Sequence, residues 1–312
     1  MIKLIFSILF LMLTGSYASI GQDKGLIKVA KLGKEGNPGL AGIRKDFIKK
    51  NPGYDIFYLP STQNVPSKAV TQVLFVQDGG GSATITAANG DKQTSKIAVG
   101  DIVLLEKGEI MEADSLLGLL AFTVPDKPDS NIPAFIRPDW DMNITDTPGG
   151  CATETNAYRR ILLTWHKDVG NYIWHSINAH RVRIMDSFSH FHPEDQGFDE
   201  FYLVQMVMPG AKLFTSENVE QISDPESIKQ EELEGLIQEH RLEVGDLVYL
   251  PRGVMHRGFG GILAQVITVP GFIPGSEIGV DHFLRQINER LGLRGKEALP
   301  FNRQASAFQV IR

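Results

Sequence analysis

Three histidines and one glutamate have the residue types and the spacing that metal chemistry requires. His190 and His192 are separated by one residue, seven residues separate His192 from Glu200, and His256 lies further along the chain. Because side chains alternate along a β-strand, His190 and His192 would point to the same face, where both imidazoles can reach one ion. Three neutral imidazoles and a carboxylate suit a divalent transition metal and leave coordination positions open for substrate, water or O₂.

The stretch HFHPEDQGFDEFYLV, residues 190–204, contains four carboxylates that compete for the fourth ligand position. Glu194 and Asp195 directly follow the proline after the histidine pair, so they lie too close to swing back easily. Glu200 opens the segment EFYLV, whose aromatic and β-branched residues are typical of a strand. We therefore expect Glu200 to be the fourth ligand, while Glu194, Asp195 and Asp199 belong to a connecting segment.

A second segment, GDLVYLPRGVMH, supplies the remaining histidine. Gly245 provides a turn at the start of a strand, and the Pro251-x-Gly253 turn redirects the chain at its end. His256 then lies where the next strand enters the same wall. This arrangement predicts that His256 completes the metal site formed by the histidine pair.

Tyr202 and Arg257 are the side chains that we expect to act on a substrate beside the metal. Tyr202 shares the strand face of Glu200, and Arg257 follows His256 directly. An arginine that points inward would imply a carboxylate substrate. The other histidines are interpreted as bystanders, although His175 and His180 are candidates for lining the pocket. They are His166, His175, His180, His240 and His282.

Short segments rich in β-branched and aromatic residues, separated by Gly, Pro, Asp and Asn, predict an all-β fold with a sandwich or barrel in each half. A helix packed on the outside of a barrel is expected over 280–291, where Phe283, Leu284, Ile287 and Leu291 have helical spacing. The expected strands are 72–77, 82–86, 102–105, 117–123, 182–188, 200–207, 247–250 and 262–268.

The two halves of the chain resemble each other weakly. Residues 96–103 match 241–248 at an offset of 145, and residues 72–77 match 200–205 at an offset of 128. The difference predicts an insertion in the second half, which we assign to a short acidic helical stretch at 225–238.

The first half lacks the metal-binding residues of the second. At the repeat offsets Gln72 stands for Glu200, Met111 stands for His256 and Glu106 replaces Pro251, and all eight histidines lie beyond residue 165. We therefore expect the first half to complete the fold, cover an edge strand or support a homodimer.

These motifs resemble those of the cupins, which are His-x-His with a following Glu, and Gly-x5-Pro-x-Gly-x2-His. The second motif matches through Gly245, Pro251, Gly253 and His256, without the Asn that often follows. The first departs in its longer spacing to Glu, so residues 193–199 are interpreted as a lengthened hairpin. The resemblance covers about 175–270 strongly and about 65–125 weakly. It implies a bicupin, with two jelly-roll barrels in one chain and a metal site only in the second.

The predicted organisation has four parts. Residues 1–18 have a lysine, an apolar run of ten residues and small residues after it, which together are typical of a signal peptide. A degenerate cupin follows over 19–125, a linker over 126–155, and a metal-binding cupin with its terminal helix over 156–312. We expect a periplasmic or secreted protein. Its single cysteine, Cys151, excludes an internal disulfide and has no adjacent base that would make it a nucleophile.

These features are compatible with three functions. The first is a metal-dependent enzyme acting on a small organic molecule, dioxygenase-like with Fe or Cu, or a lyase or isomerase with Mn, Ni or Zn. The second is a binding module without turnover, and the third is a structural bicupin with a vestigial site. We expect one divalent ion, Fe, Mn, Ni, Zn or Cu, with Fe or Mn favoured. The net charge of −6 without a basic run argues against nucleic acid or membrane partners.

Overall fold

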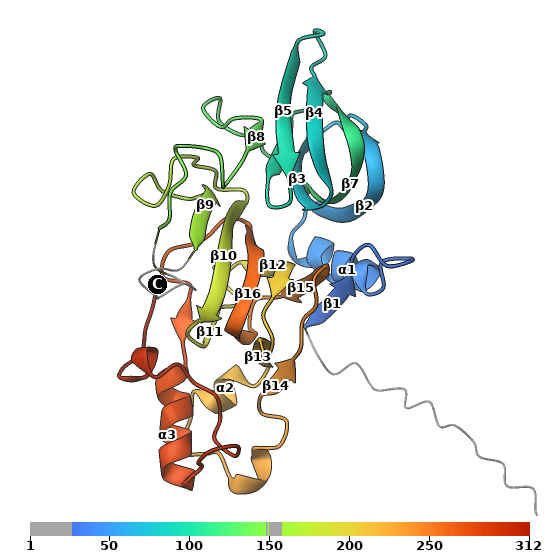
Figure 1. The fold of residues 1–312 in the computed structure, drawn as a ribbon. Helices are drawn as coiled ribbons and strands as arrows, with labels where there is room; N and C mark the ends of the chain where they lie inside the picture. Colours follow the sequence, from blue (N-terminus) through green and yellow to red (C-terminus); the bar gives the residue numbers. More distant parts are fainter. Residues whose placement is uncertain (1–26, 148, 150–157) are drawn as a thin grey trace, which may run out of the picture.

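The computed structural model describes residues 27–147, 149 and 158–312, which form mainly strands in two sheets (Figure 1). The predicted all-β class is therefore confirmed, with one barrel-like sheet in each half of the chain. The predicted signal peptide and Cys151 lie outside the described residues. No helix in the described part of the chain is long and apolar enough to cross a membrane.

The first sheet is built around one long strand, with apolar side chains filling its interior. Its strands are β2 (Asp55–Val65), β3 (Thr71–Asp78), β4 (Gly80–Thr86), β5 (Lys92–Ala98), β6 (Ile102–Leu105), β7 (Ile110–Val124) and β8 (Phe135–Ile136). The long strand β7 pairs antiparallel with β2, β3 and β4. β6 extends the sheet beyond β3, and β5 extends it beyond β4.

The second sheet has the same plan around another long strand. Its strands are β1 (Lys28–Lys31), β9 (Arg159–Leu163), β10 (Asn178–Asp186), β11 (His190–Phe191), β12 (Asp199–Val207), β13 (Lys212–Ser216), β14 (Gln238–His240), β15 (Asp246–Leu250), β16 (Met255–Val269) and β17 (Ile278–Gly279). The long strand β16 pairs with β10, β11, β12 and β13. β15 pairs with β12 as β6 pairs with β3.

The strand registers agree with the sequence repeat. In the first sheet Gln72 lies opposite Leu105, and in the second Glu200 lies opposite Leu250. Gln72 and Glu200 differ by the offset of 128, and Leu105 and Leu250 differ by the offset of 145. The same positions of the two halves therefore occupy the same places in two similar sheets.

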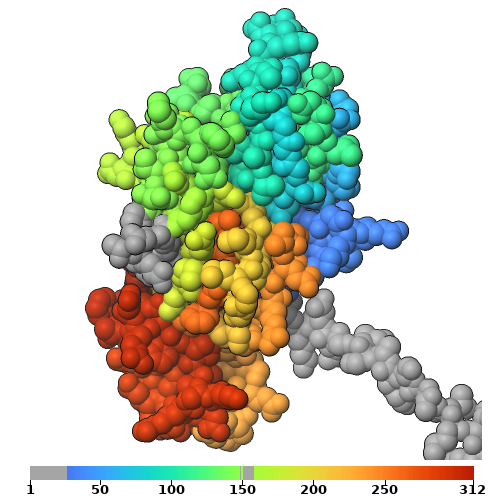
Figure 2. All heavy atoms as spheres, in the orientation of Figure 1, coloured from blue at the N-terminus to red at the C-terminus, as the bar shows by residue number. Residues whose placement is uncertain are grey.

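The N-terminal segment crosses from one half to the other. β1 pairs with β15 in the second sheet, although the predicted boundaries had placed these residues in the first barrel. The helix α1 (Leu40–Lys50) follows and inserts Phe47 between the sheets, where it contacts Phe122 of the first half and Phe201 of the second. Burial of these rings in one shared apolar core holds the two halves together, and Figure 2 shows them in continuous contact.

The helix expected near the C-terminus is α3 (Asp281–Leu291), and it lies outside the second sheet (Figure 1). The insertion expected over 225–238 is helical only in part. It contains a short 3-10 turn (Gln230–Glu232), the short helix α2 (Val219–Ile222) lies just before it, and the rest consists mainly of turns. Ile228 and Leu236 are buried in a cluster with residues of α3, so tertiary packing overrides the local helical pattern.

Two further expectations differ from the structure. The strands predicted at 117–123 and 262–268 are only the C-terminal parts of β7 and β16, and the one at 182–188 begins earlier as β10. Residues 193–199 do not form a hairpin, because β11 pairs with β16 and β17 and not with β12. The segment is a connection that brings the histidine pair alongside β16.

Candidate metal centre

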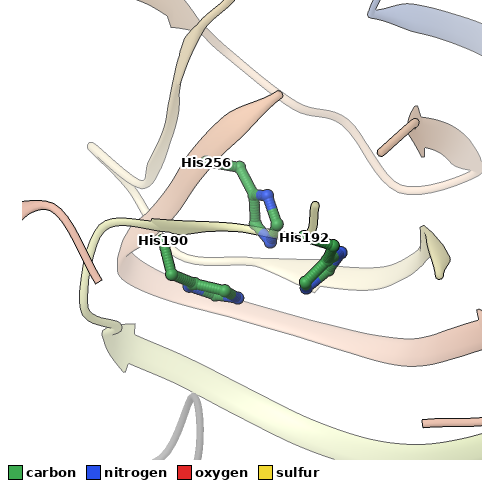
Figure 3. A group of neighbouring side chains, drawn as sticks. All are labelled: His190, His192 and His256. Carbon is green, nitrogen blue, oxygen red and sulfur yellow. The ribbon is translucent and has the colours of Figure 1, made fainter. Parts of the chain in front are cut away.

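The structure brings the three predicted histidines together. His190 on β11 lies directly opposite His256 on β16, and His192 follows two residues later on the same side (Figure 3). One ring nitrogen of each lies within 4.8 Å of those of the other two, and all three side chains are buried. In the described residues, this is the only such group of histidine, cysteine or carboxylate side chains. The rings therefore converge on one point.

Backbone groups orient these rings. The Nδ1 atom of His190 lies 3.1 Å from the Phe188 carbonyl oxygen, and that of His256 lies 3.3 Å from the Val254 carbonyl oxygen. A carbonyl oxygen only accepts, so Nδ1 carries the proton and donates, and Nε2 presents its lone pair. His192 has a backbone hydrogen bond with Phe198 and packs on its ring.

Burial lowers the pKa values of His190 and His192 well below their usual range, because the charged imidazolium is poorly solvated there. The neighbouring His256 lowers both pKa values further. Both rings are therefore neutral at physiological pH, which is the form that binds a metal ion.

Glu200 of β12 reaches the same point. Its Oε1 atom lies 3.1 Å from Nε2 of His256, and its Oε2 atom lies 4.0 Å from Nε2 of His192. The exposed side chain of Glu194 instead forms an ion pair with Lys50. Asp195 is exposed, and the buried Asp199 bonds to other partners. The structure therefore places Glu200, and not its three competitors, beside the histidines.

The turn after β15 fixes the position of His256. Gly253 has a φ of 86°, in the left-handed region that favours glycine, and its N–H donates a hydrogen bond of 2.7 Å to the His192 carbonyl oxygen. A Cβ at this position would also lie 2.7 Å from the Glu194 carboxylate. The turn that contains Pro251 and Gly253 is thus bonded directly to the histidine pair, through the backbone of His192.

The donor set fits a divalent transition metal. Nε2 of each histidine and Oε1 of Glu200 are buried without a hydrogen-bond partner among the described residues. Two acceptors as close as those of His256 and Glu200 repel each other unless a cation or proton lies between them. Ligands about 2.1 Å from one ion and at right angles lie about 3 Å apart, which matches this separation. An ion bound by all four residues would satisfy four otherwise unfavourable buried atoms.

A cavity of about 360 Å³ adjoins Glu200. Its described lining includes alternate residues of β9, namely Arg159, Ile161 and Leu163, as the strand pleat requires. His180 of β10 also lines it, as anticipated for one of two histidines, whereas His175 is exposed. Burial, and then the charge of Arg159, lower the pKa of His180 well below its usual range.

Glu277 is a second carboxyl group in the cavity, and sequence reasoning missed it. Its Oε1 atom lies 3.9 Å from Nε2 of His190, and the residue is buried. Burial, and then the nearby charge of Glu200, raise the pKa of Glu277 to about 7. Glu277 lies in the chain after β16, where backbone pairing with Arg312 holds it in place. No motif or repeat in the sequence marks this position.

The two predicted catalytic side chains lie elsewhere. Tyr202 is buried in the apolar interior of the second sheet, with its ring centroid 6.1 Å from that of His256, and it does not line the cavity. Arg257 points away from the histidines, donating from Nε to the Ser187 carbonyl oxygen at 3.0 Å and pairing with Asp186. Because neighbours on a strand face opposite sides, Arg257 cannot share the side of His256.

The first sheet has apolar residues at the corresponding positions. Met111 lies opposite Val65 there, as His256 lies opposite His190 in the second sheet, and both side chains are buried in the first core. Gln72 occupies the place of Glu200 and donates from Nε2 to the Pro66 carbonyl oxygen at 3.1 Å. The first sheet therefore has no metal-binding side chain at the positions that correspond to His190, His256 and Glu200.

No protein-family model and no curated protein matches the sequence. Among solved structures, an oxalate decarboxylase of Bacillus subtilis is 12% identical over 79% of this chain and 74% of its own, with a TM-score of 0.43. An oxalate decarboxylase of Lactobacillus farciminis, in a formate complex, is 15% identical over 81% and 85%, with a TM-score of 0.43. AerE from Microcystis aeruginosa is 10% identical over 69% and 86%, again at 0.43. The chain's own geometry defines an all-β protein with two barrel-like sheets and a candidate metal centre in the second.

Proposed function

We propose that this chain is a bicupin metalloenzyme that binds one divalent transition metal and acts on a small organic acid in the adjoining cavity. The observation that carries the proposal is the set of four buried donor atoms without hydrogen-bond partners, next to a cavity of about 360 Å³. His190, His192, Glu200 and His256 would hold the ion. A site of this kind leaves coordination positions open, and Fe or Mn is favoured.

The reaction that we propose first is dioxygenase-like. The bound ion would supply the Lewis acidity or redox chemistry for which the donor set leaves room. The protein itself contributes a cavity with largely apolar walls and two arginines, Arg159 and Arg312, which would attract and orient an anionic substrate. With the predicted signal peptide, the proposal places this activity in the periplasm or outside the cell.

Glu277 supports a second candidate, a lyase or isomerase that does not use O₂. Its carboxyl group lines the cavity and faces His190, and the three histidines and Glu200 already suffice as ligands. A carboxyl group in this position could exchange a proton with a bound substrate. Measurement of O₂ consumption during turnover separates the two candidates.

Metal analysis of the mature protein tests the proposal. We expect about one transition-metal ion per chain, lost in the His190→Ala and His256→Ala variants and retained in His166→Ala, which changes an exposed histidine. Two ions per chain would contradict a first sheet without a site. No bound metal after reconstitution with Fe, Mn, Ni, Zn and Cu would overturn the proposed function.

A further inference from the structure

Aromatic rings connect the cavity wall to the metal centre. Trp165 and Phe272 line the cavity and stack with centroids 3.9 Å apart and planes 29° apart. Phe272 contacts Phe198 at 5.3 Å, and Phe198 packs on His192 at 3.9 Å. A flat ring placed against Phe272 would extend this row, because aromatic rings favour offset or tilted contacts at such separations.

The charges around the cavity favour a negatively charged ligand. Arg159 and Arg312 line it, and together with a divalent ion they contribute four positive charges. The carboxyl groups are Glu200, Glu277 and Asp168, so they contribute at most three negative charges. Asp168 counts least, because its side chain is 88% exposed and solvent screens it.

The cavity wall contains two buried polar atoms that could form hydrogen bonds with a ligand. Thr268 Oγ1 and His180 Nε2 are buried without a hydrogen-bond partner among the described residues, and both side chains line the cavity. Thr268 is 4% exposed and lies opposite Glu200 in the sheet. A hydroxyl donates readily to a carboxylate oxygen, so Thr268 is placed to bind an acid group close to the metal ligand.

We propose, building on the proposed function, that the substrate is an aromatic carboxylate. Its ring lies against Phe272 and Trp165, and its carboxylate lies beside Thr268 and Arg159. A small dicarboxylate would leave the aromatic wall without contacts. A sugar carries no charge for Arg159 and Arg312 to bind, although Thr147, Asn178, His180 and Thr268 offer neutral polar partners.

Calorimetric titration with benzoate tests this assignment, with benzamide, cyclohexanecarboxylate and oxalate as comparison ligands. Metal-loaded and metal-free protein are both titrated, and the metal content of each sample is measured. We expect benzoate to bind about tenfold more tightly than benzamide, which has the same shape without the charge. It should also bind more tightly than cyclohexanecarboxylate and oxalate.

Two variants locate the binding site. Arg159→Gln and Phe272→Leu should each weaken benzoate binding by about tenfold. The matched controls are Arg160→Gln, at an arginine that pairs with Asp146, and Phe308→Leu, at an exposed ring. Both control variants should bind benzoate as tightly as the wild type does.

Equal binding of benzamide, a preference for cyclohexanecarboxylate or oxalate, or no effect of Arg159→Gln and Phe272→Leu would overturn the substrate class. If the protein nevertheless contains metal, these results would contradict only the substrate class and not the proposed metalloenzyme. Benzoate binding that depends on Arg159 in protein that takes up no metal would support the ligand class and overturn the metalloenzyme.

Discussion

Asn51 donates a hydrogen bond of 2.6 Å from Nδ2 to Oδ2 of Asp199, and both residues are buried. This bond joins the end of α1 to the residue directly before the candidate ligand Glu200. Asp199 also accepts from Tyr249 at 3.0 Å and from the backbone N–H and Nε of Arg252, each at 3.1 Å. Since Arg252 lies in the Pro-x-Gly turn before His256, one carboxylate ties the N-terminal segment to both metal-binding motifs.

Substitution of Asp199 should weaken both the fold and the metal site. Asp199→Asn leaves the half-buried Arg252 without its counter-charge, which should lower the free energy of unfolding by about 3 kcal/mol. Because Asp199 positions the chain before Glu200, metal affinity should fall by about tenfold or more. Urea denaturation and competitive metal titration measure these two effects.

The matched control is Asp195→Asn, an exposed carboxylate of the same connecting segment, which should leave both quantities unchanged. Asn51→Ala, which removes only one partner of Asp199, should give the same changes at smaller size, about 1 to 2 kcal/mol in stability. A loss of stability with unchanged metal affinity in both variants would limit this network to folding.

Among the carboxylates Glu200, Glu194 and Glu277, we expect only Glu200 to be essential for metal binding. Glu200→Gln should weaken metal binding by at least about a hundredfold, because a neutral amide is a poor ligand for these ions. Glu194→Gln, at an exposed site, should have no effect, and Glu277→Gln should change affinity only slightly because four other donors remain. Competition with a chromogenic chelator measures all three, and a large loss in Glu277→Gln would make Glu277 a ligand.

The lowered pKa of His180 should make the free energy of unfolding depend on pH. Its folded pKa is lowered below the usual value of about 6.5, so as pH falls below that value the unfolded chain binds the proton first. The stability contributed by neutral His180 is present above about pH 6.5 and is lost as pH falls from there toward the lower folded pKa. His180→Gln should therefore reduce the slope of stability against pH by up to about 1.4 kcal/mol per pH unit.

Urea midpoints of metal-free protein between pH 7.5 and 5 measure this slope. Metal-free protein is required because proton-linked release of an ion would add its own slope. His166→Gln, at an exposed histidine, is the control and should keep the wild-type slope. An unchanged slope in His180→Gln would show that His180 takes up its proton equally in both states.

The positions that sequence predicted best are those that repeat or alternate. The offsets between the halves placed Gln72 and Glu200 at equivalent points, and the registers place them there too. The alternation of a strand put His190 and His192 on one side. The strand character of the segment after residue 199 put Glu200 at the start of a strand, and there its carboxylate lies beside His256 and His192.

The parts that sequence missed depend on how distant segments return to the site. Glu277 reaches the cavity only because the chain after β16 folds back and pairs with Arg312, and no periodicity records that path. α1 contacts Asp199 because β1 crosses to the second sheet, which a division of the chain by its repeat does not foresee. The orientation of Arg257 could have been predicted from the sequence, because neighbouring residues of a strand face opposite sides of the sheet and His256 directly precedes it.

Arg257 gives the last prediction, which distinguishes a structural role from the catalytic one first expected. Its guanidinium group is buried between the Ser187 carbonyl, Asp186 and the rings of Phe214 and Phe259. Arg257→Ala should lower the free energy of unfolding by about 2 kcal/mol while metal content and benzoate binding stay at the wild-type level. Arg183→Ala removes an exposed arginine from β10 and should change none of these quantities. Weaker benzoate binding in Arg257→Ala, with stability intact, would return Arg257 to the site.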